Sequence, residues 1–278
     1  MISRVNNHRD YINHRDYINY PDYINHYILE KKKEKDKYCY PPTHRALTII
    51  ACHVSDMVRL QTIKQNIRYL NFKHNNIIVV TTANLPLNIK LKQFCNINKI
   101  QYLETVNDKW LDFGKWLYVL ENTDYTDYES IYFTNDSFII KSSIFHFFNL
   151  AFEKKTEIYA YTSSSELNYH YQSYLFSINK EVISTFIHLI REKIDSKTQF
   201  NAVHIELNLL HNFTNKDCFL DLGKNESNIK QNIFFTNNQF YYPLFNAQLL
   251  PFVKLKRTIT NKNKNGSKKL INSSFYQW

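Results

Sequence analysis

A carboxylate with polar neighbours follows one of the apolar segments in the middle of the chain. Residues 130–134 read as a short strand, and Asn135, Asp136 and Ser137 come directly after it. A carboxylate at the end of a strand can hold a divalent cation, and that cation can neutralise a diphosphate as it leaves. Asp136 is therefore a candidate catalytic and metal-binding residue. Asp and Ser also cap turns after strands, so a purely structural role is the alternative.

A second group lies upstream, where Asp112, Gly114 and Lys115 occur within four residues. The chain has only three glycines, so Gly114 is expected to meet a backbone requirement, either a positive φ or the close approach of another group. A simple turn into a helix is the alternative. Phe113 completes an Asp-Phe-Gly triplet like that of protein kinases, but no Gly-rich loop accompanies it.

A third group lies downstream. Gln172 and Ser173 precede an apolar stretch over 174–178, and the pattern of 182–194 predicts an amphipathic helix. A further helix is expected to carry Glu206 near its start. The helix dipole also favours an acidic residue there, which gives Glu206 a structural alternative.

The elements around these groups alternate along the chain. Strands are predicted over 46–52, 77–82, 101–106, 130–134 and 157–162. Helices are predicted after a Ser55 cap, over 87–96 and 113–121, and after a cap at Ser142 or Ser143. Such alternation implies βαβ units and an α/β fold with a mainly parallel central sheet flanked by helices. Parallel sheets bind ligands beyond the carboxyl ends of their strands, where His53 and Asp136 are both expected.

The missing motifs and the composition narrow the function. Neither a Gly-x-Gly-x-x-Gly pattern nor a Gly-Lys-Thr/Ser loop occurs, which disfavours dinucleotide-binding proteins and P-loop NTPases. The net charge of +10 accompanies an abundance of Lys, Asn and Ile, so an A/T-rich genome, for example that of a giant virus, explains the basicity as well as a polyanionic partner does. With no apolar signal segment, no membrane-length apolar run and no metal-type cysteine spacing, a cytoplasmic location is expected.

The two ends of the chain are expected to differ from its middle. Residues 1–45 contain a six-residue repeat over 8–25 and then a charged run at 30–35. This composition predicts a flexible arm and linker, and an element that docks on the domain is the alternative. Residues 46–256 are predicted to form the folded domain, and 257–278 a basic tail.

Five pieces of the chain, taken in their order, resemble the rhamnan synthesis protein F family, which belongs to the glycosyltransferase A-like proteins. They are Asp112-Phe113-Gly114-x-Trp116, a strand ending in Asn135-Asp136-Ser137, His170-x-Gln172-Ser173-Tyr174, Glu206 after a helix, and Pro251-Phe252-x-Lys254. The resemblance covers residues 46–256. It implies a Rossmann-like glycosyltransferase A-type fold that transfers sugar from a nucleoside-diphosphate donor to a glycan or polysaccharide acceptor.

The resemblance also implies roles for single residues. Such transferases commonly use Asp-x-Asp at a strand end to hold Mn²⁺ or Mg²⁺ on the donor diphosphate, and Asp136 matches that position. This chain has one carboxylate there instead of two. Lys115 or the basic residues Lys254, Lys256 and Arg257 could therefore do part of the cation's work. The residues expected to bind the donor are His53, Asp112, Gly114, Lys115, Asn135, Ser137, Gln172, Ser173 and Lys254.

An inverting transferase needs a general base for the acceptor hydroxyl, whereas a retaining one does not. Glu206 is the candidate, since its place near a helix start resembles that of the base in inverting enzymes of this fold, and Glu166 and Asp112 are alternatives. Two other functions stay open. One is a catalytically inactive scaffold or glycan-binding module of the same fold. The other is a basic nucleic-acid-binding protein, although no recognisable nucleic-acid module is present and no specific nucleic-acid partner is expected.

Overall fold

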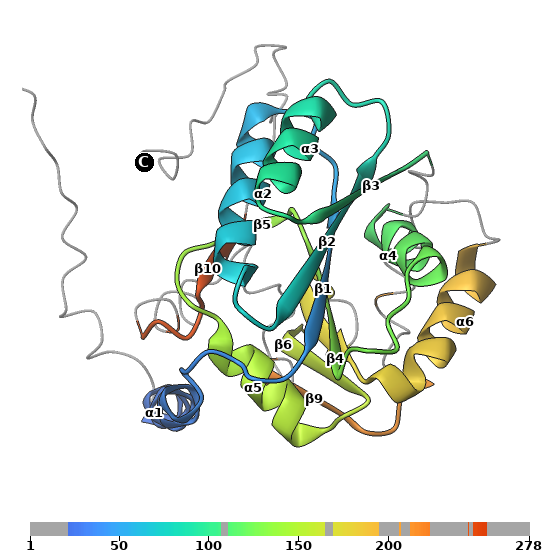
Figure 1. Ribbon diagram of the computed structural model, residues 1–278. Coiled ribbons are helices and arrows are strands. Elements are labelled where there is room, and N and C mark those ends of the chain that lie inside the picture. The colour runs from blue at the N-terminus through green and yellow to red at the C-terminus, as the bar shows by residue number, and fades with distance from the viewer. Residues whose placement is uncertain are drawn as a thin grey trace, which may run out of the picture.

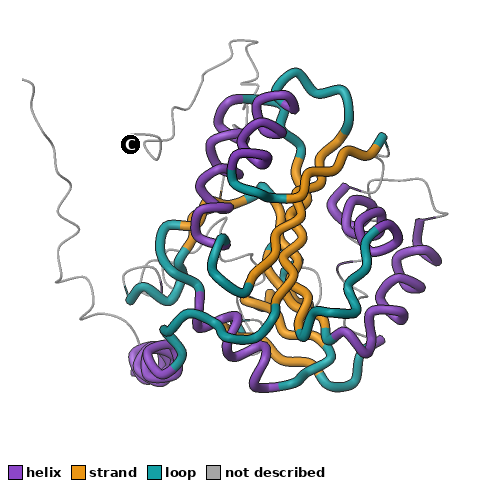
Figure 2. Tube along the Cα trace, viewed as in Figure 1, coloured by secondary structure: helices purple, strands orange, loops and turns teal. Residues whose placement is uncertain are grey.

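A mixed sheet runs through the middle of the molecule, with helices on both sides (Figure 1 and Figure 2). The computed structural model describes residues 22–106, 111–164, 169–194, 206, 212–222, 244 and 247–254. Within these residues, eight strands form one sheet in the order β3-β2-β1-β4-β8-β6-β7, with β9 paired to β6. The strands are β1 (Ala46–Cys52), β2 (Asn75–Thr82), β3 (Gln101–Thr105), β4 (Ser130–Asn135), β6 (Ile158–Ser164), β7 (His170–Tyr171), β8 (Leu175–Ile178) and β9 (Lys216–Leu220).

The sheet is mainly parallel, as the sequence predicts. β1 pairs in parallel with both β2 and β4, and β2 pairs in parallel with β3. β8 is the reversed strand between β4 and β6, and β9 is parallel to β6. The predicted α/β fold class is therefore confirmed.

Each face of the sheet has its own apolar core and its own helices. α2 (Met57–Leu70), α3 (Asn88–Ile97) and α5 (Phe145–Lys154) cover one face, while α4 (Leu111–Asn122) and α6 (Ile183–Ile194) cover the other (Figure 1). β1 alternates between the two cores: Ala46 and Ile50 join the first, and Leu47 and Ile49 the second. A strand buried on both faces reads as a continuous apolar run, which is why 46–52 was recognisable in the sequence.

Most predicted elements lie where expected, and the differences are at their ends. The predicted strand over 46–52 coincides with β1. The cap of α2 is Asp56, whose carboxylate accepts a hydrogen bond from the Arg59 N–H at 2.9 Å, so the prediction of Ser55 is wrong. Before α6 the chain forms a short 3-10 turn, η2 (Lys180–Val182).

The N-cap of α5 also differs from the prediction. That position is Ile144, which follows the expected Ser142 and Ser143. Ser143 Oγ nevertheless accepts a hydrogen bond from the Phe145 N–H at 3.3 Å.

Residues 22–45 do not form the flexible arm that the sequence predicts. α1 (Asp22–Lys37) packs against α5, and Ile24 and Ile28 are 1% and 6% exposed within the first core. Asn149 of α5 donates hydrogen bonds to the carbonyls of Tyr38 and Tyr40 at 3.0 and 2.8 Å. The four-residue spacing of the isoleucines puts both on one helical face, a signal that the repeat concealed. Residues 1–21 and the predicted tail 257–278 lie outside the described residues.

A second, smaller sheet holds the chain just after β4. β5 (Phe138–Ile140) pairs antiparallel with β10 (Phe252–Lys254). The buried Asn66 of α2 donates to the Phe138 carbonyl and accepts from the Ile140 N–H, both at 2.8 Å. Since β4 and β5 are each anchored, the turn over 135–137 between them is fixed at both ends.

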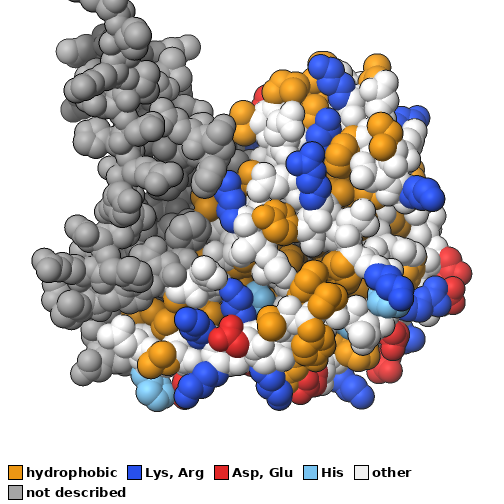
Figure 3. Space-filling view, turned by 60° about the vertical axis from the view of Figure 1, so that its left-hand side comes forward, with side chains coloured by type: hydrophobic (Ala, Val, Ile, Leu, Met, Phe, Trp, Pro, Cys, Tyr) orange, Lys and Arg blue, Asp and Glu red, His pale blue; other side chains and the backbone are white. Residues whose placement is uncertain are grey.

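The surface over α2 and α3 is basic and partly apolar. These two helices contain Arg59, Lys64, Arg68, Lys90 and Lys92 but no Asp or Glu, and Figure 3 shows lysine and arginine side chains among hydrophobic ones on this side. The charge of this face is thus uncompensated within its own helices. None of the described helices is long and apolar enough to cross a membrane.

Candidate functional site

The chain reverses its direction of travel across the sheet at β1. From β1 it steps outward to β2 and β3 through α2 and α3, and α4 then carries it over the other face to β4 on the far side of β1. Right-handed crossovers in opposite directions place their helices on opposite faces. In sheets of this kind, ligands bind beyond the carboxyl ends of the two strands where the order reverses, here β1 and β4.

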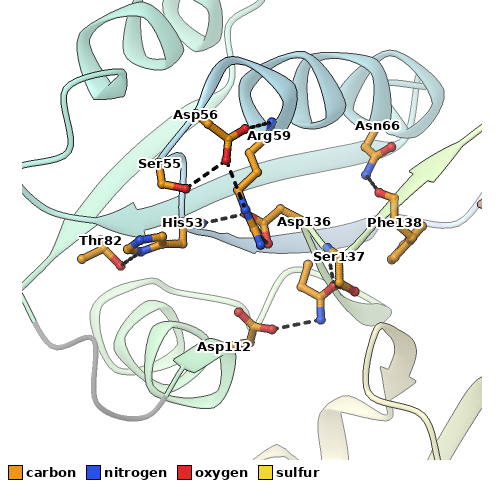
Figure 4. A network of polar contacts seen from close by, with 11 residues as sticks. His53, Ser55, Asp56, Arg59, Asn66, Thr82, Asp112, Asp136, Ser137 and Phe138 are labelled. Carbon is orange, nitrogen blue, oxygen red and sulfur yellow. Dashed lines mark hydrogen bonds and ion pairs between the residues drawn. The ribbon is translucent and has the colours of Figure 1, made fainter. Parts of the chain in front are cut away.

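Asp136 follows β4 at this edge and is held by two groups from the β1 side (Figure 4). Its Oδ2 accepts a hydrogen bond from the main-chain N–H of His53 at 2.9 Å. Its Oδ1 lies 2.7 Å from Nη1 of Arg59, which makes an ion pair. The Asp136 side chain is 7% exposed and that of Arg59 is 22% exposed. The carboxylate is therefore shielded, while its cationic partner reaches solvent.

Arg59 stands in the first turn of α2, beside the Asp56 cap (Figure 4). Nε of Arg59 lies 3.9 Å from Oδ2 of Asp56. Burial lowers the pKa of Arg59, but the charges of Asp136 and Asp56 more than offset this, so the pKa is raised and the guanidinium stays charged. Arg59 is not recognisable from the sequence, because its local sequence does not distinguish it from the other basic residues of α2.

Asp112 meets the same turn from the opposite face of the sheet. Its Oδ2 accepts a hydrogen bond from Nδ2 of Asn135 at 2.9 Å. Asn135 Oδ1 in turn accepts from the N–H and the hydroxyl of Ser137, at 3.0 and 2.6 Å. Burial raises the pKa of Asp112 to about 7; Lys115 opposes the rise and the nearby Asp136 adds to it. This half-buried carboxyl therefore changes its charge close to neutral pH.

Trp116 fixes α4 against β4. Its indole Nε1–H donates to the Thr134 carbonyl at 3.3 Å, and its ring packs edge-on against Phe133 and Phe176. Trp116 follows Asp112 by four residues, so the two side chains share one face of the helix. The contact that holds Trp116 on β4 thus also places Asp112 beside Asn135.

Gly114 and Lys115 lie inside α4 and are both buried. Gly114 has a helical backbone, so the predicted positive φ is not found there. Lys115 is 1% exposed. Burial raises the pKa values of Asp112 and Cys52, and the charge of Lys115 opposes both rises. At this edge Arg59 rather than Lys115 is the cation that reaches solvent.

Ser173 and Glu206 extend the edge on the other side of β4. β8 runs antiparallel to β4, so its amino end lies at the carboxyl end of β4, where Thr134 Oγ1 donates to the Tyr174 carbonyl at 2.9 Å. The Ser173 N–H donates to Glu206 Oε1 at 2.7 Å. Glu206 is thus brought to the same edge as Asp136, although 70 residues separate them in the sequence.

Two further predicted donor-binding residues, His53 and Gln172, differ in their exposure to solvent. His53 Nδ1 is 3.2 Å from Thr82 Oγ1, at the carboxyl end of β2. The polar groups at the strand ends therefore extend to β2. Gln172 is buried, and its Oε1 accepts hydrogen bonds from the hydroxyls of Thr162 and Tyr174 at 2.7 and 3.2 Å. Gln172 therefore joins β6 to the start of β8.

The last predicted donor residue, Lys254, is placed by its backbone. β10 sets Lys254 opposite Phe138, two residues beyond Asp136. The predicted alternatives Glu166, Lys256 and Arg257 lie outside the described residues.

The side chains of this site do not fit a divalent metal as they stand. Asp136 already has a guanidinium on one oxygen and an N–H on the other. The Asn135 Oδ1 is taken by Ser137, and Asp112 accepts from Asn135 and is partly protonated near pH 7. Among the described residues, no three His, Cys, Asp or Glu side chains gather in a way that could hold a metal ion. A metal at Asp136 would first have to displace Arg59.

Among known proteins, the chain is similar only in fold, and only to distantly related solved structures. No family model and no curated protein matches the chain. It is similar to a 4-diphosphocytidyl-2C-methyl-D-erythritol synthase from Anaerococcus prevotii, with 14% identity, a TM-score of 0.45, and 74% of this chain and 96% of that chain covered. It is also similar to a mannosyltransferase from Pyrobaculum calidifontis solved with GDP-Man and Mn²⁺, with 8% identity, a TM-score of 0.42, and coverage of 59% and 55%.

A third likeness is to a glycosyltransferase from Streptococcus pneumoniae, with 14% identity, a TM-score of 0.44, and coverage of 63% of this chain and 45% of that chain. At such identities and TM-scores, none of these likenesses assigns a substrate or a residue role to this chain. The resemblance to the rhamnan synthesis protein F family stays a prediction.

Proposed function

We propose that this chain is a glycosyltransferase that moves a sugar from a nucleoside-diphosphate donor to a glycan or polysaccharide acceptor. The observation that carries the proposal is a row of groups across adjacent strand ends. Asp136 and Arg59 meet where β1 and β4 end, and Glu206 is held at the start of β8, the next strand. Neighbouring strands lie about 4.8 Å apart. A diphosphate bound where β1 and β4 end would therefore have its sugar between that point and Glu206.

The β1–β4 end of the row suits an anion. Arg59 presents a partly exposed guanidinium there, and planar guanidinium groups match phosphate oxygens in two-point contacts. The first turn of α2 lies at the same place, and a helix N-terminus favours negative charge. A diphosphate is the part of a nucleotide sugar that carries this charge.

The β8 end suits the acceptor. In the transfer, the acceptor hydroxyl oxygen bonds to the anomeric carbon while the bond from that carbon to the diphosphate oxygen breaks, and its electron pair leaves with the diphosphate. When the configuration inverts, the hydroxyl proton passes to Glu206. The Ser173 N–H orients this carboxylate through Oε1. Asp112 is the alternative base, since a pKa near 7 suits proton transfer at neutral pH.

The proposal is tested with a panel of nucleotide sugars. We expect at least one donor to raise the melting temperature of the full chain, and to be hydrolysed slowly to free nucleoside diphosphate with water as acceptor. Asp136→Asn is the matched control, because asparagine keeps the side-chain shape and removes the charge. If no donor stabilises or is cleaved by the wild-type chain, the proposal is wrong.

A catalytically inactive glycan-binding or scaffold module is the second candidate. It is favoured by one specific observation, namely that the single carboxylate after β4 is already neutralised by Arg59. Such a module would bind a nucleoside diphosphate or a glycan without releasing any product. Binding of a donor with no hydrolysis, in the presence of oligosaccharide acceptors as well as in their absence, would support this candidate.

A further inference from the structure

We propose that Arg59, and not a divalent metal, supplies the positive charge that binds the donor diphosphate, with Asp136 as the residue that positions Arg59. This inference rests on the proposed function and names the cation that would act in it. It begins from the ion pair of 2.7 Å between Arg59 Nη1 and Asp136 Oδ1. The guanidinium occupies the side of the carboxylate where a metal ion would have to bind.

The charges at this edge leave little attraction for a second cation. Asp136 and Arg59 sum to zero, and the nearest carboxylate on the α2 side, Asp56, is engaged as a helix cap. On the α4 side, Asp112 is opposed by the buried Lys115. A divalent ion binds best where several anionic oxygens converge, and the described residues bring together no such set.

Arg59 keeps the means to bind phosphate while it is paired. A guanidinium carries five N–H donors in a fixed plane. Nη1 is directed at Asp136 and Nε lies 3.9 Å from Asp56, whereas among the described residues Nη2 takes part in no hydrogen bond or ion pair. The Arg59 side chain as a whole is 22% exposed, so solvent reaches part of it. One edge of the guanidinium is therefore anchored and the other is available to an anion.

The same charge assists the transfer step. As the bond between the anomeric carbon and the diphosphate oxygen breaks, its electron pair adds negative charge to the leaving group. A fixed cation at that oxygen stabilises the developing charge. Asp136 holds the guanidinium in place, and the N–H of His53 holds Asp136. In this arrangement Asp136 acts through Arg59 and does not touch the donor.

The first test needs no variant. UDP and dTDP are titrated calorimetrically into the full chain, once with EDTA and once with Mn²⁺. We expect the better-bound nucleotide to have the same affinity in both conditions, within a factor of about two. Binding that requires Mn²⁺ would overturn the role of Arg59 while leaving the proposed function intact. Absence of binding in both conditions would overturn the inference together with its donor site.

The second test compares two arginines of one helix. Arg59→Gln is expected to weaken nucleotide binding by at least about tenfold, the effect of about 1.4 kcal/mol. Arg68→Gln, an exposed arginine in the last turn of α2, is expected to leave the affinity unchanged. Arg59→Lys should fall between them, because lysine keeps the charge but loses the planar fork. Equal affinities in Arg59→Gln and Arg68→Gln proteins of wild-type melting temperature would overturn the inference.

Discussion

Two carboxylates lie at the turn after β4, Asp136 within the turn and Asp112 on α4, and their surroundings differ. Asp136 pairs with a guanidinium from α2 and accepts the N–H of His53. Asp112 comes from α4 and accepts a hydrogen bond from the neutral amide of Asn135, and burial raises its pKa to about 7. One carboxylate is neutralised by a cation, whereas the other is neutralised by a proton over part of the physiological range.

This difference shows that the environment assigns chemistry to residues of one type. Carboxylates whose surroundings favour different protonation states can serve in different steps of one reaction. Here the surroundings on each side decide the outcome: the guanidinium of Arg59 on the α2 side, and burial of the carboxyl group on the α4 side. Substitutions on the α2 side and on the α4 side should therefore alter the difference between Asp136 and Asp112 in different ways.

The largest expected effect comes from removing the charge of Asp136. Asp136→Asn releases Arg59 from its partner, so we expect donor binding to weaken and sugar transfer to fall by about 10²- to 10³-fold. Asparagine still accepts the N–H of His53, and Arg59 can be hydrated, so the folded state should lose only about 1–2 kcal/mol of stability. Donor hydrolysis and thermal melting are measured side by side. A wild-type rate of sugar transfer by a folded Asp136→Asn protein would contradict the role of the Asp136 charge.

The next effect concerns Glu206, which is held by the Ser173 N–H just before β8. Removing a general base typically costs roughly 10²- to 10⁴-fold in rate and leaves donor binding intact. We expect Glu206→Gln to show this separation of turnover from affinity if the enzyme inverts the anomeric centre. Turnover and calorimetric donor affinity are compared in the same preparation. If turnover is unchanged, Glu206 is not the base, and Asp112→Asn becomes the variant to assay.

A smaller effect should appear in the pH dependence of stability. Because the pKa of Asp112 is raised from 3.8 to about 7 on folding, its contribution favours the folded state below pH 3.8 and is lost as the pH rises through 7. Asp112→Asn should flatten this part of the profile, since asparagine still accepts the hydrogen bond from Asn135. Melting temperatures between pH 4 and pH 8 provide the measurement. Parallel profiles for the variant and the wild type would contradict the raised pKa.

A milder substitution tests the role of Trp116, which fixes α4 against β4. Trp116→Phe removes the Nε1–H that donates to the Thr134 carbonyl but keeps an aromatic ring in the core. We expect a loss of about 1–3 kcal/mol in stability, the cost of leaving a buried carbonyl without its donor. Nucleotide affinity should stay near the wild-type value, because Arg59 belongs to the other face. A large loss of affinity would mean that the two faces are coupled.

The smallest effect on the site should come from the N-terminal segment. Deleting residues 1–40 removes the buried side chains of Ile24, Ile28 and Tyr38 from the first core. Each buried apolar side chain contributes about 1.5–3 kcal/mol, so the melting temperature should fall by many degrees. Nucleotide affinity of the protein that remains folded should not change. An unaltered melting temperature would show that α1 contributes nothing to the fold.

Local sequence patterns determined the helices and strands, and they also predicted that His53 and Asp136 lie together. Apolar runs and helical periodicity located β1, β2, α2 and α4 to within a few residues, because each pattern depends on neighbours a few positions apart. The parallel-sheet rule then placed His53 and Asp136 at one edge, and the structure joins them by a hydrogen bond. This relation needed only the direction of the strands, which the alternation of strands and helices already implied.

Tertiary structure alone decided which groups these residues meet. The partner of Asp136 is one of three basic residues in α2, and only the crossing of α2 over the sheet selects Arg59. The raised pKa of Asp112 depends on the solvent that is lost when α4 packs. The docking of α1 depends on a core that other elements supply. Desolvation and pairing are properties of groups distant in sequence, so no local pattern carries them.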